Sequence, residues 1–280
     1  GQSGLWPEGL QSALQIADKE QFDTWFSTLN QPVKFEGSYS FTRQLQRELS
    51  DGSRVQFIWN KSDTWQTITL SLDKKYKSSQ WFNAEDGSVI NNSSSSKISY
   101  QLPPYGTIIL YASTKNSIEN ATSKVSNLKP NDAETVVSIE NWGISADTLK
   151  ITNTKLFDFK THETFRSVGS EIIYKSSFEM SNLTPNSTYL LDLGKVYHTA
   201  EVVINGKWAG KRIFAPYTLD VSQFLQKGKN NIEIRVLPTP LNYFIGQAVA
   251  GNKHYRQFKK SEGQLMSNGL MGEVRIVKIN

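Results

Sequence analysis

The chain contains no cysteine, and this absence excludes several kinds of chemistry at once. Disulfide scaffolds, cysteine nucleophiles and thiolate metal sites all require a thiol. Histidine is also scarce: the three histidines, His162, His198 and His254, lie far apart in the sequence, so no histidine metal site is expected. His198 precedes a strand-like run, and we interpret it as a hydrogen-bonded structural histidine.

Long hydrophobic runs are missing as well. The longest are short, such as residues 108–112, whereas a helix needs ~20 apolar residues to cross a bilayer. The sequence therefore excludes a transmembrane helix. The chain starts Gly1-Gln2-Ser3-Gly4, with neither a basic nor an apolar stretch, so it shows no signal peptide at this point. Secretion stays open, because such a start can be internal or that of a mature protein.

Most catalytic signatures are absent. There is no Gly-x-Ser-x-Gly elbow, no phosphate-binding glycine loop and no His-Glu-x-x-His helix. Glycoside hydrolysis needs only two carboxyl groups placed across a sugar. The candidates are Glu140, Asp158, Glu163, Glu171, Glu262 and Glu273. Nothing in the sequence brings two of them together, so we assign no catalytic residue.

The charge balance gives little indication of a partner. There are 31 basic and 26 acidic residues, a net charge of +5, and the basic residues are scattered. One cluster interleaves basic residues with aromatic ones: Lys253, His254, Tyr255, Arg256, Phe258, Lys259 and Lys260. Such a pattern can bind nucleic acid. Because no helix-turn-helix, RNA-binding or zinc-finger pattern accompanies it, we interpret it as a solvated loop and expect no nucleic-acid partner.

A single amphipathic helix is predicted near the start. Asp18 can cap it, with Gln21 three residues later completing a capping box. Its apolar stripe has helical spacing and consists of Phe22, Trp25, Phe26 and Leu29. Pro32 follows its end. We expect this helix to pack against the sheet that follows.

After the helix, apolar residues alternate with polar ones, which is typical of half-buried strands. Strands are predicted at residues 55–59, 68–72, 98–102 and 107–111, separated by turns at 51–52, 86–87, 91–96 and 103–104. Residues 1–115 are therefore predicted to form a helix and a β-sandwich. A polar stretch, residues 116–132, is predicted to be a linker.

Strand patterns resume in residues 133–280. They fall at residues 136–140, 148–152, 171–180, 188–193, 200–204, 231–237 and 273–279. Asn205-Gly206 is a two-residue hairpin signal. Residues 220–228 resemble one helical turn with an aspartate cap and a glycine stop. The fold class predicted is all-β: two β-sandwich domains, the second a jelly roll, and one short N-terminal helix.

Aromatic side chains are the remaining signal, and seven of them are tryptophan. Flat aromatic faces suit the C–H surfaces of sugars. Trp59, Trp65 and Trp142 lie in or beside strand-like runs and are expected in the core. Trp208 and Tyr217 follow a hairpin and a loop, so exposure is more plausible there.

Four segments of the second domain resemble a known module: 191–194 (LDLG), 200–210 (AEVVINGKWAG), 216–221 (PYTLDV) and 227–234 (KGKNNIEI). Their order is similar to the galactose-binding-like jelly roll of the β-galactosidase/β-glucuronidase enzymes. The flanking segments 167–174 (SVGSEIIY), 241–246 (LNYFIG) and 269–276 (GLMGEVRI) resemble the C-terminal end of glycoside hydrolase family 106, the α-L-rhamnosidase-like enzymes. In those enzymes a β-domain follows the catalytic barrel. Three segments of the first domain resemble this β-domain: 47–52 (RELSDG), 57–60 (FIWN) and 81–87 (WFNAEDG).

The resemblance implies a role without catalysis. Those enzymes carry their catalytic carboxylates on an N-terminal (β/α)₈ barrel, and this chain has neither the length nor the alternating pattern for one. The family's Asn-Arg start after the jelly roll is Asn242-Tyr243 here, and its closing aspartate is Gln247. We expect a non-catalytic, carbohydrate-associated region of a secreted or periplasmic bacterial glycoside hydrolase, supporting or completing a sugar cleft.

Two partners are expected: a plant or bacterial glycan, and an N-terminal catalytic domain outside this chain. The resemblance to the α-L-rhamnosidases implies that the glycan contains rhamnose. The predicted sugar-binding residues are Trp208, Tyr217, Asn242 and Tyr243, while Asn205 and Asp220 are assigned to a turn and a cap. No cofactor is expected. Related jelly rolls often hold a structural calcium ion, but no Asp-rich loop indicates a site for one. Two alternatives remain open: a stand-alone glycan-binding protein, and a small glycosidase with an unrecognised carboxylate pair.

Overall fold

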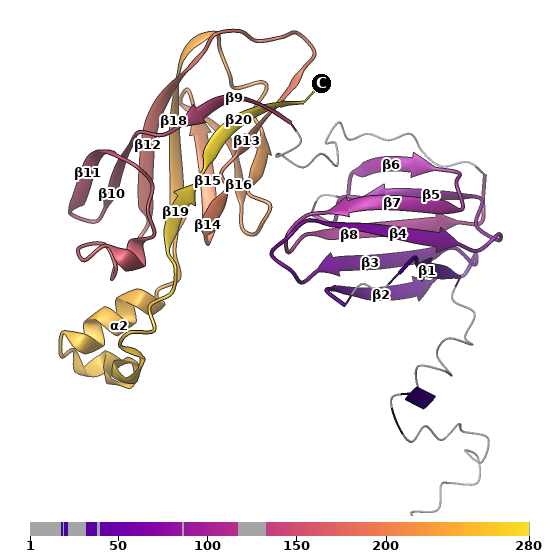
Figure 1. Ribbon diagram of the computed structural model, residues 1–280, viewed down its shortest axis with the longest axis horizontal. Helices are drawn as coiled ribbons and strands as arrows, with labels where there is room; N and C mark the ends of the chain where they lie inside the picture. The colour runs from indigo at the N-terminus through magenta and orange to yellow at the C-terminus, as the bar shows by residue number, and fades with distance from the viewer. Residues whose placement is uncertain are drawn as a thin grey trace, which may run out of the picture.

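The computed structural model describes residue 18 and residues 20–21, 32–37, 40–85, 87–116 and 133–279. Its described part consists of two lobes of antiparallel strands, drawn in indigo to magenta and in rose to yellow in Figure 1. The predicted all-β fold class is confirmed. At the start of the predicted N-terminal helix, the backbone N–H of Gln21 donates a hydrogen bond to Oδ1 of Asp18 at 2.9 Å. The rest of that helix lies outside the described residues.

The N-terminal sandwich has two sheets. The smaller sheet pairs β1 (Val33–Phe35), β4 (Gln66–Leu72) and β7 (Lys97–Leu102) in that order. The larger pairs β2 (Thr42–Glu48), β3 (Arg54–Asn60), β8 (Thr107–Ser113), β5 (Ser78–Phe82) and β6 (Val89–Ser93). All four predicted strands are present as β3, β4, β7 and β8. The polar run 91–96 was predicted to be a turn, but β6 occupies its first half.

Alternation along each strand builds the core of this sandwich. Ile58, Leu70 and Leu110 are completely buried between the sheets. The next residue after Ile58, Trp59, points to the other face and is 38% exposed, so the prediction that it lies in the core is wrong.

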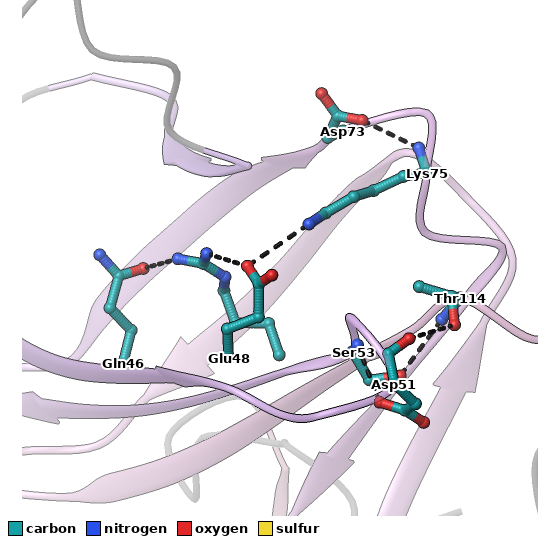
Figure 2. A network of polar contacts seen from close by, with 8 residues as sticks. Gln46, Glu48, Asp51, Ser53, Asp73, Lys75 and Thr114 are labelled. Atoms are coloured by element: carbon teal, nitrogen blue, oxygen red, sulfur yellow. Dashed lines mark hydrogen bonds and ion pairs between the residues drawn. The ribbon is translucent and has the colours of Figure 1, made fainter.

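At one end of this sandwich the Arg54 guanidinium donates hydrogen bonds to Gln46 and Glu48, and Lys75 donates to the same Glu48 carboxylate (Figure 2).

The C-terminal sandwich contains two main sheets and a two-stranded ribbon. The six-stranded sheet runs β11 (Leu149–Thr154), β10 (Trp142–Ala146), β12 (Ile172–Met180), β18 (Gly228–Leu237), β15 (Thr199–Ile204) and β16 (Lys207–Arg212). The four-stranded sheet runs β17 (Thr218–Asp220), β13 (Thr188–Asp192), β20 (Val274–Ile279) and β9 (Glu134–Ile139), and β14 (Lys195–Tyr197) pairs with β19 (Gly269–Gly272). All seven predicted strands are present.

The core of the C-terminal sandwich is separate from that of the first. Its buried cluster runs from Ile139 to Ile276, whereas the N-terminal cluster runs from Val33 to Ala112. Trp142 is buried as predicted, and its indole N–H donates to the Ile139 carbonyl at 3.0 Å. The proposed linker 116–132 lies outside the described residues from 117 onward, so its bounds stay a prediction.

The turn and the cap predicted in this sandwich are both present. Asn205 (φ +51°) and Gly206 (φ +77°) form the left-handed turn between β15 and β16. Asp220 Oδ1 accepts the backbone N–H of Ser222 at 3.0 Å. Residues 222–224 then form a single turn, and Gly228 (φ +86°) starts β18.

Three helical segments were not predicted. A 3₁₀ turn, η3 (Phe159–Thr161), is short, but α2 (Leu241–Val249) and η4 (Lys253–Ser261) form a helical hairpin at one end of the sandwich (Figure 1). The basic cluster was interpreted as a solvated loop: its basic side chains are exposed, but the loop is wrong, because the cluster lies in η4. The Phe244 ring stacks on Tyr255 and lies against Phe258, with centroids 5.2 Å apart in both cases. These aromatic rings are thus engaged within the hairpin. No helix in the described ranges is long and apolar enough to cross a membrane.

Candidate functional site

The four predicted sugar-binding residues fall in three different places. Trp208 lies on β16 just after the hairpin turn and is 61% exposed. Tyr217 precedes β17 and is half-buried, and its hydroxyl donates to the backbone carbonyl of His198. The structure does not bring Trp208 and Tyr217 into one cavity. Contact of either with a sugar stays a prediction.

The other two residues are packed into the helical hairpin. Asn242 is 1% exposed, and its amide both donates to the Met266 carbonyl (2.8 Å) and accepts the Met266 N–H (2.9 Å). Tyr243 is 37% exposed and lies edge-on to Tyr255. A Cβ at Gly169 would lie 2.6 Å from that of Tyr243, so the hairpin is seated directly on the 167–169 segment. The Asn242 amide would have to break two hydrogen bonds to contact a sugar, and for both residues such contact stays a prediction.

A larger feature lies where the two sandwiches meet. This cavity, called the junction cavity below, has a volume of about 640 Å³. Its N-terminal wall comes from the loops that follow β3 and β7, and its C-terminal wall from β14 and the segment before β17. The lining residues are Asp63, Trp65, Pro104, Tyr105, Asp192, Gly194, Lys195, Val196, Tyr197, His198, Ile213, Phe214, Ala215, Pro216, Tyr217 and Thr218.

The aromatic residues of the junction cavity come from both sides. Trp65 is half-buried and Tyr105 is 54% exposed on the N-terminal side. Phe214 is 37% exposed on the C-terminal side. Trp65 was expected in the core, but the structure places it in the wall of the cavity. Exposed aromatic residues that face one another across a hollow are a common feature of binding sites.

One polar side chain in the cavity lacks a partner. His198 Nε2 is buried and, within the described part of the chain, has no hydrogen-bond partner. The prediction of a hydrogen-bonded structural histidine is therefore wrong for this side chain, although the His198 carbonyl does accept a hydrogen bond from Tyr217. Buried polar atoms are usually paired, so an unpaired one needs an explanation.

Two other polar groups of the cavity are already engaged. The Asp192 carboxylate accepts from Arg275 Nη2 at 3.0 Å and from the Gly194 N–H at 3.0 Å. Burial, and next the proximity of Tyr197, raise the pKa of the Tyr217 hydroxyl. This hydroxyl is therefore a neutral donor at physiological pH.

A second, smaller hollow of about 140 Å³ adjoins the junction cavity and shares Trp65, Phe214, Pro216 and Thr218 with it. The ion pair between Arg212 and Glu85 lines this hollow, and it bridges the two sandwiches. A charged contact between the two sandwiches thus lies beside a space that is partly lined by aromatic residues.

The candidate carboxylates do not form a closed site. Asp158 caps η3, because it accepts the backbone N–H groups of Lys160 (3.1 Å) and Asn268 (3.0 Å). Glu140 and Glu273 are brought together in one open groove of about 360 Å³, also lined by Lys155, but both are exposed. Glu163, Glu171 and Glu262 are exposed as well. Of the six candidates, Asp158 is therefore committed to backbone hydrogen bonds, and the other five are exposed to solvent.

The described residues contain no cluster of acidic or histidine side chains of the kind that holds a structural metal. Within the described ranges, no three His, Asp or Glu side chains lie close enough together to hold a metal ion. Calcium takes six to eight oxygen ligands, several of them from carboxylates. The structure therefore suggests no position for the calcium ion that related jelly rolls often contain.

Comparison with known proteins supports the interpretation of the second sandwich. Residues 148–265 match the family model described as the glycosyl hydrolase 2 galactose-binding domain-like family. A protein of Formosa agariphila that is named as a β-glucuronidase is 39% identical to this chain over 75 residues. These residues make up 26% of this chain and 6% of that protein. A second protein so named, from the same organism, is 38% identical over 65 residues, 22% of this chain and 8% of that protein. The C-terminal sandwich is thus similar to the galactose-binding-like domain of glycoside hydrolases.

The fold of the whole chain also has a counterpart. The structure of a rhamnosidase from Novosphingobium sp. PP1Y matches 93% of this chain with a TM-score of 0.70 at 17% identity. This chain covers 26% of the rhamnosidase chain, and so it spans far less than the length of the proteins that it resembles. At this identity the likeness concerns the fold alone. The rhamnosidase therefore contains a region of this fold within a longer chain.

Proposed function

We propose that this chain is a non-catalytic, carbohydrate-associated region of a glycoside hydrolase related to the α-L-rhamnosidases of family 106. The observation that carries the proposal is the fold likeness across 93% of the chain to one quarter of a rhamnosidase. The galactose-binding-like match over residues 148–265 supports it independently. The region buttresses a catalytic domain of the same polypeptide and completes its sugar cleft.

The partner and the cellular location proposed for the chain follow from the class of enzyme. The proposed partner is a glycan of plant or bacterial origin that contains rhamnose, and the proposed location is the periplasm or the exterior of a bacterium. The arrangement of carboxylates favours an accessory role over catalysis. Glu140 and Glu273 share an open groove, whereas a glycosidase acid is kept protonated by burial or by a neighbouring negative charge.

The experiment compares the 280-residue chain with the product of the complete open reading frame. Both are assayed on nitrophenyl α-L-rhamnoside and on rhamnose-containing polysaccharide. We expect hydrolysis only by the complete product, and loss of that hydrolysis when residues 40–280 are deleted. Release of sugar by the isolated chain would overturn the proposal. If the Glu140→Gln or Glu273→Gln variant abolished that release, the exposed pair would be catalytic.

A stand-alone glycan-binding protein is the second candidate, and the junction cavity is the observation that favours it. It predicts that the complete gene product hydrolyses no glycoside and that the chain alone retains full affinity for a glycan. Glycan-array binding together with the hydrolysis assay separates the two candidates.

A further inference from the structure

We infer that the junction cavity is a binding site for one neutral pyranose unit, and that both sandwiches must contribute to it. This inference rests on the proposed function for the class of ligand, a glycan. The position of the site comes from the structure itself. Neither the matched family segment nor the predicted sugar residues include the N-terminal wall, which Trp65 and Tyr105 form.

The size of the cavity suits a small ligand. Its volume of about 640 Å³ lies within the roughly 300–1,000 Å³ typical of small-molecule sites. A space of this size admits one sugar ring and leaves room for the linkage to the next. Two protein lobes commonly form such sites where they meet.

The aromatic lining suits the apolar faces of a sugar ring. Tyr105 and Trp65 on one wall face a C-terminal wall that includes Phe214, and two of these three rings are substantially exposed. Exposure of large apolar side chains is unfavourable unless a partner covers them. A pyranose ring has C–H groups that pack on such rings, and its hydroxyl groups still point outward to polar partners.

The polar lining provides the hydrogen bonds that a hydroxyl group needs. His198 Nε2 has no partner within the described residues, and either tautomer of the ring can pair with a hydroxyl, because this group both donates and accepts. Pairing would relieve the cost of leaving a buried polar atom unsatisfied.

The charges of the cavity favour a neutral ligand over an acidic one. The charged side chains that line it are Asp63, Asp192 and Lys195. Arg275 already pairs with Asp192, which leaves one acidic and one basic side chain, Asp63 and Lys195, whose charges sum to zero over the lining. A uronic acid would bring a negative charge toward Asp63 without a bidentate arginine partner.

The test is a titration of the full 280-residue chain, labelled with ¹⁵N, followed through its tryptophan indole signals by NMR. The probes are the methyl pyranosides of L-rhamnose, D-galactose and D-mannose, with glucuronate as the charged comparison. The variants are Tyr105→Ala and Trp65→Ala. The matched control is Trp59→Ala, which removes an exposed tryptophan that does not line the cavity.

We expect at least one neutral pyranoside to shift the Trp65 indole signal and to leave that of Trp59 unchanged. Tyr105→Ala, at an exposed turn position, should keep the fold and weaken the binding about tenfold or more, which corresponds to roughly 1.4 kcal/mol. Trp65→Ala should weaken binding similarly, and the control Trp59→Ala should not.

Three results would overturn the inference: no shift of Trp65 with any pyranoside, binding that is unaffected by Tyr105→Ala, or tighter binding of glucuronate than of every neutral sugar. None of these would overturn the proposed function, which depends on hydrolysis by the complete gene product. Conversely, cavity binding without any hydrolysis by that product would contradict the proposed function and leave the cavity assignment standing.

Discussion

Arg212 on β16 and Glu85, just after β5, form an ion pair that joins the two sandwiches across 127 positions of sequence. Arg212 Nε also donates to the Thr218 carbonyl at 2.6 Å, which orients the guanidinium group toward Glu85. The pair lines the smaller hollow that adjoins the junction cavity.

A double-mutant cycle with Arg212→Ala and Glu85→Ala measures this contact. Because both side chains are partly exposed, we expect a coupling free energy of only about 0.2–1 kcal/mol. Arg212→Ala should cost more than Glu85→Ala, since it also loses the Thr218 bond. Urea denaturation gives the values, and Arg235→Ala serves as a control within one sandwich. A coupling of zero at low salt would mean that the pair does not hold the junction.

Asn230 carries the buried polar network beneath the β15–β16 hairpin. Its amide accepts from Asn205 Nδ2 (2.8 Å) and the Gln226 N–H (2.9 Å), and it donates to the carbonyls of Gln226 (2.7 Å) and Gly228 (2.9 Å). Asn230→Ala would leave these partners unsatisfied and should lower the free energy of unfolding by about 2–3 kcal/mol. Asn231→Ala, at the exposed neighbouring position, should cost less than about 0.5 kcal/mol. Similar midpoints for both variants in urea would contradict the role of the network.

Much of this fold could be predicted from the sequence, since the strands with clear alternation, such as β3, β4 and β18, lie where the pattern indicated. The short strands β14, β17 and β19 have three or four residues, too few to show a period. The helix α2 has no side-chain hydrogen bond at its N-cap, Pro240, and its first turn contains no acidic residue, so it lacked the usual start signals. Two signs of η4 were available: the spacing of Tyr255 and Phe258, because residues i and i+3 align on a 3₁₀ helix, and Asn252, whose side chain caps it.

The site could not be predicted in the same way. The walls of the junction cavity come from four separate segments, and only the packing of the sandwiches brings Trp65 and Phe214 together. The sequence assigned Asn205 and Asp220 correctly because a turn and a cap are local. It could not show that the buried nitrogen of His198 would lack a partner, because that depends on every neighbouring element.

Gly246 in α2 allows the helical hairpin to lie against the sandwich. A Cβ at this position would lie 2.7 Å from the Cβ of Ser167. Alanine favours a helix by about 1 kcal/mol over glycine, but a clash of this kind costs about 1–3 kcal/mol. We therefore expect Gly246→Ala to destabilise the chain on balance. Adding Ser167→Gly removes the clashing atoms and should restore stability in thermal unfolding. Stabilisation by Gly246→Ala alone would show that the contact is loose.

Glu233 makes the stability of the second sandwich sensitive to acid. Hydrogen bonding from Lys175 is the main cause that lowers the pKa of its carboxyl group, and Arg235 adds to it. A lowered pKa in the folded state stabilises the protein above the ordinary carboxyl pKa of about 4.3, and this contribution is lost as the pH falls through the folded value.

The variant Glu233→Gln should therefore be less stable than the parent at pH 7, by about 0.5–1 kcal/mol. The difference should shrink as the pH falls below about 4. Urea denaturation between pH 7 and pH 3 measures it, with Glu179→Gln on the same sheet as the control. A difference that is constant over this range would show that the carboxylate charge contributes nothing.

Removal of divalent metal is expected to leave the thermal stability unchanged. Within the described ranges, no cluster of three acidic or histidine side chains could hold a calcium ion. A calcium ion at a concentration one hundred times its Kd would stabilise the folded state by about 2.7 kcal/mol, and its removal would lower Tm by several degrees. Calorimetry of the chain before and after dialysis against EDTA distinguishes these cases. A drop in Tm that calcium reverses and magnesium does not would establish a calcium site built from residues beyond the described ranges or from backbone carbonyl groups.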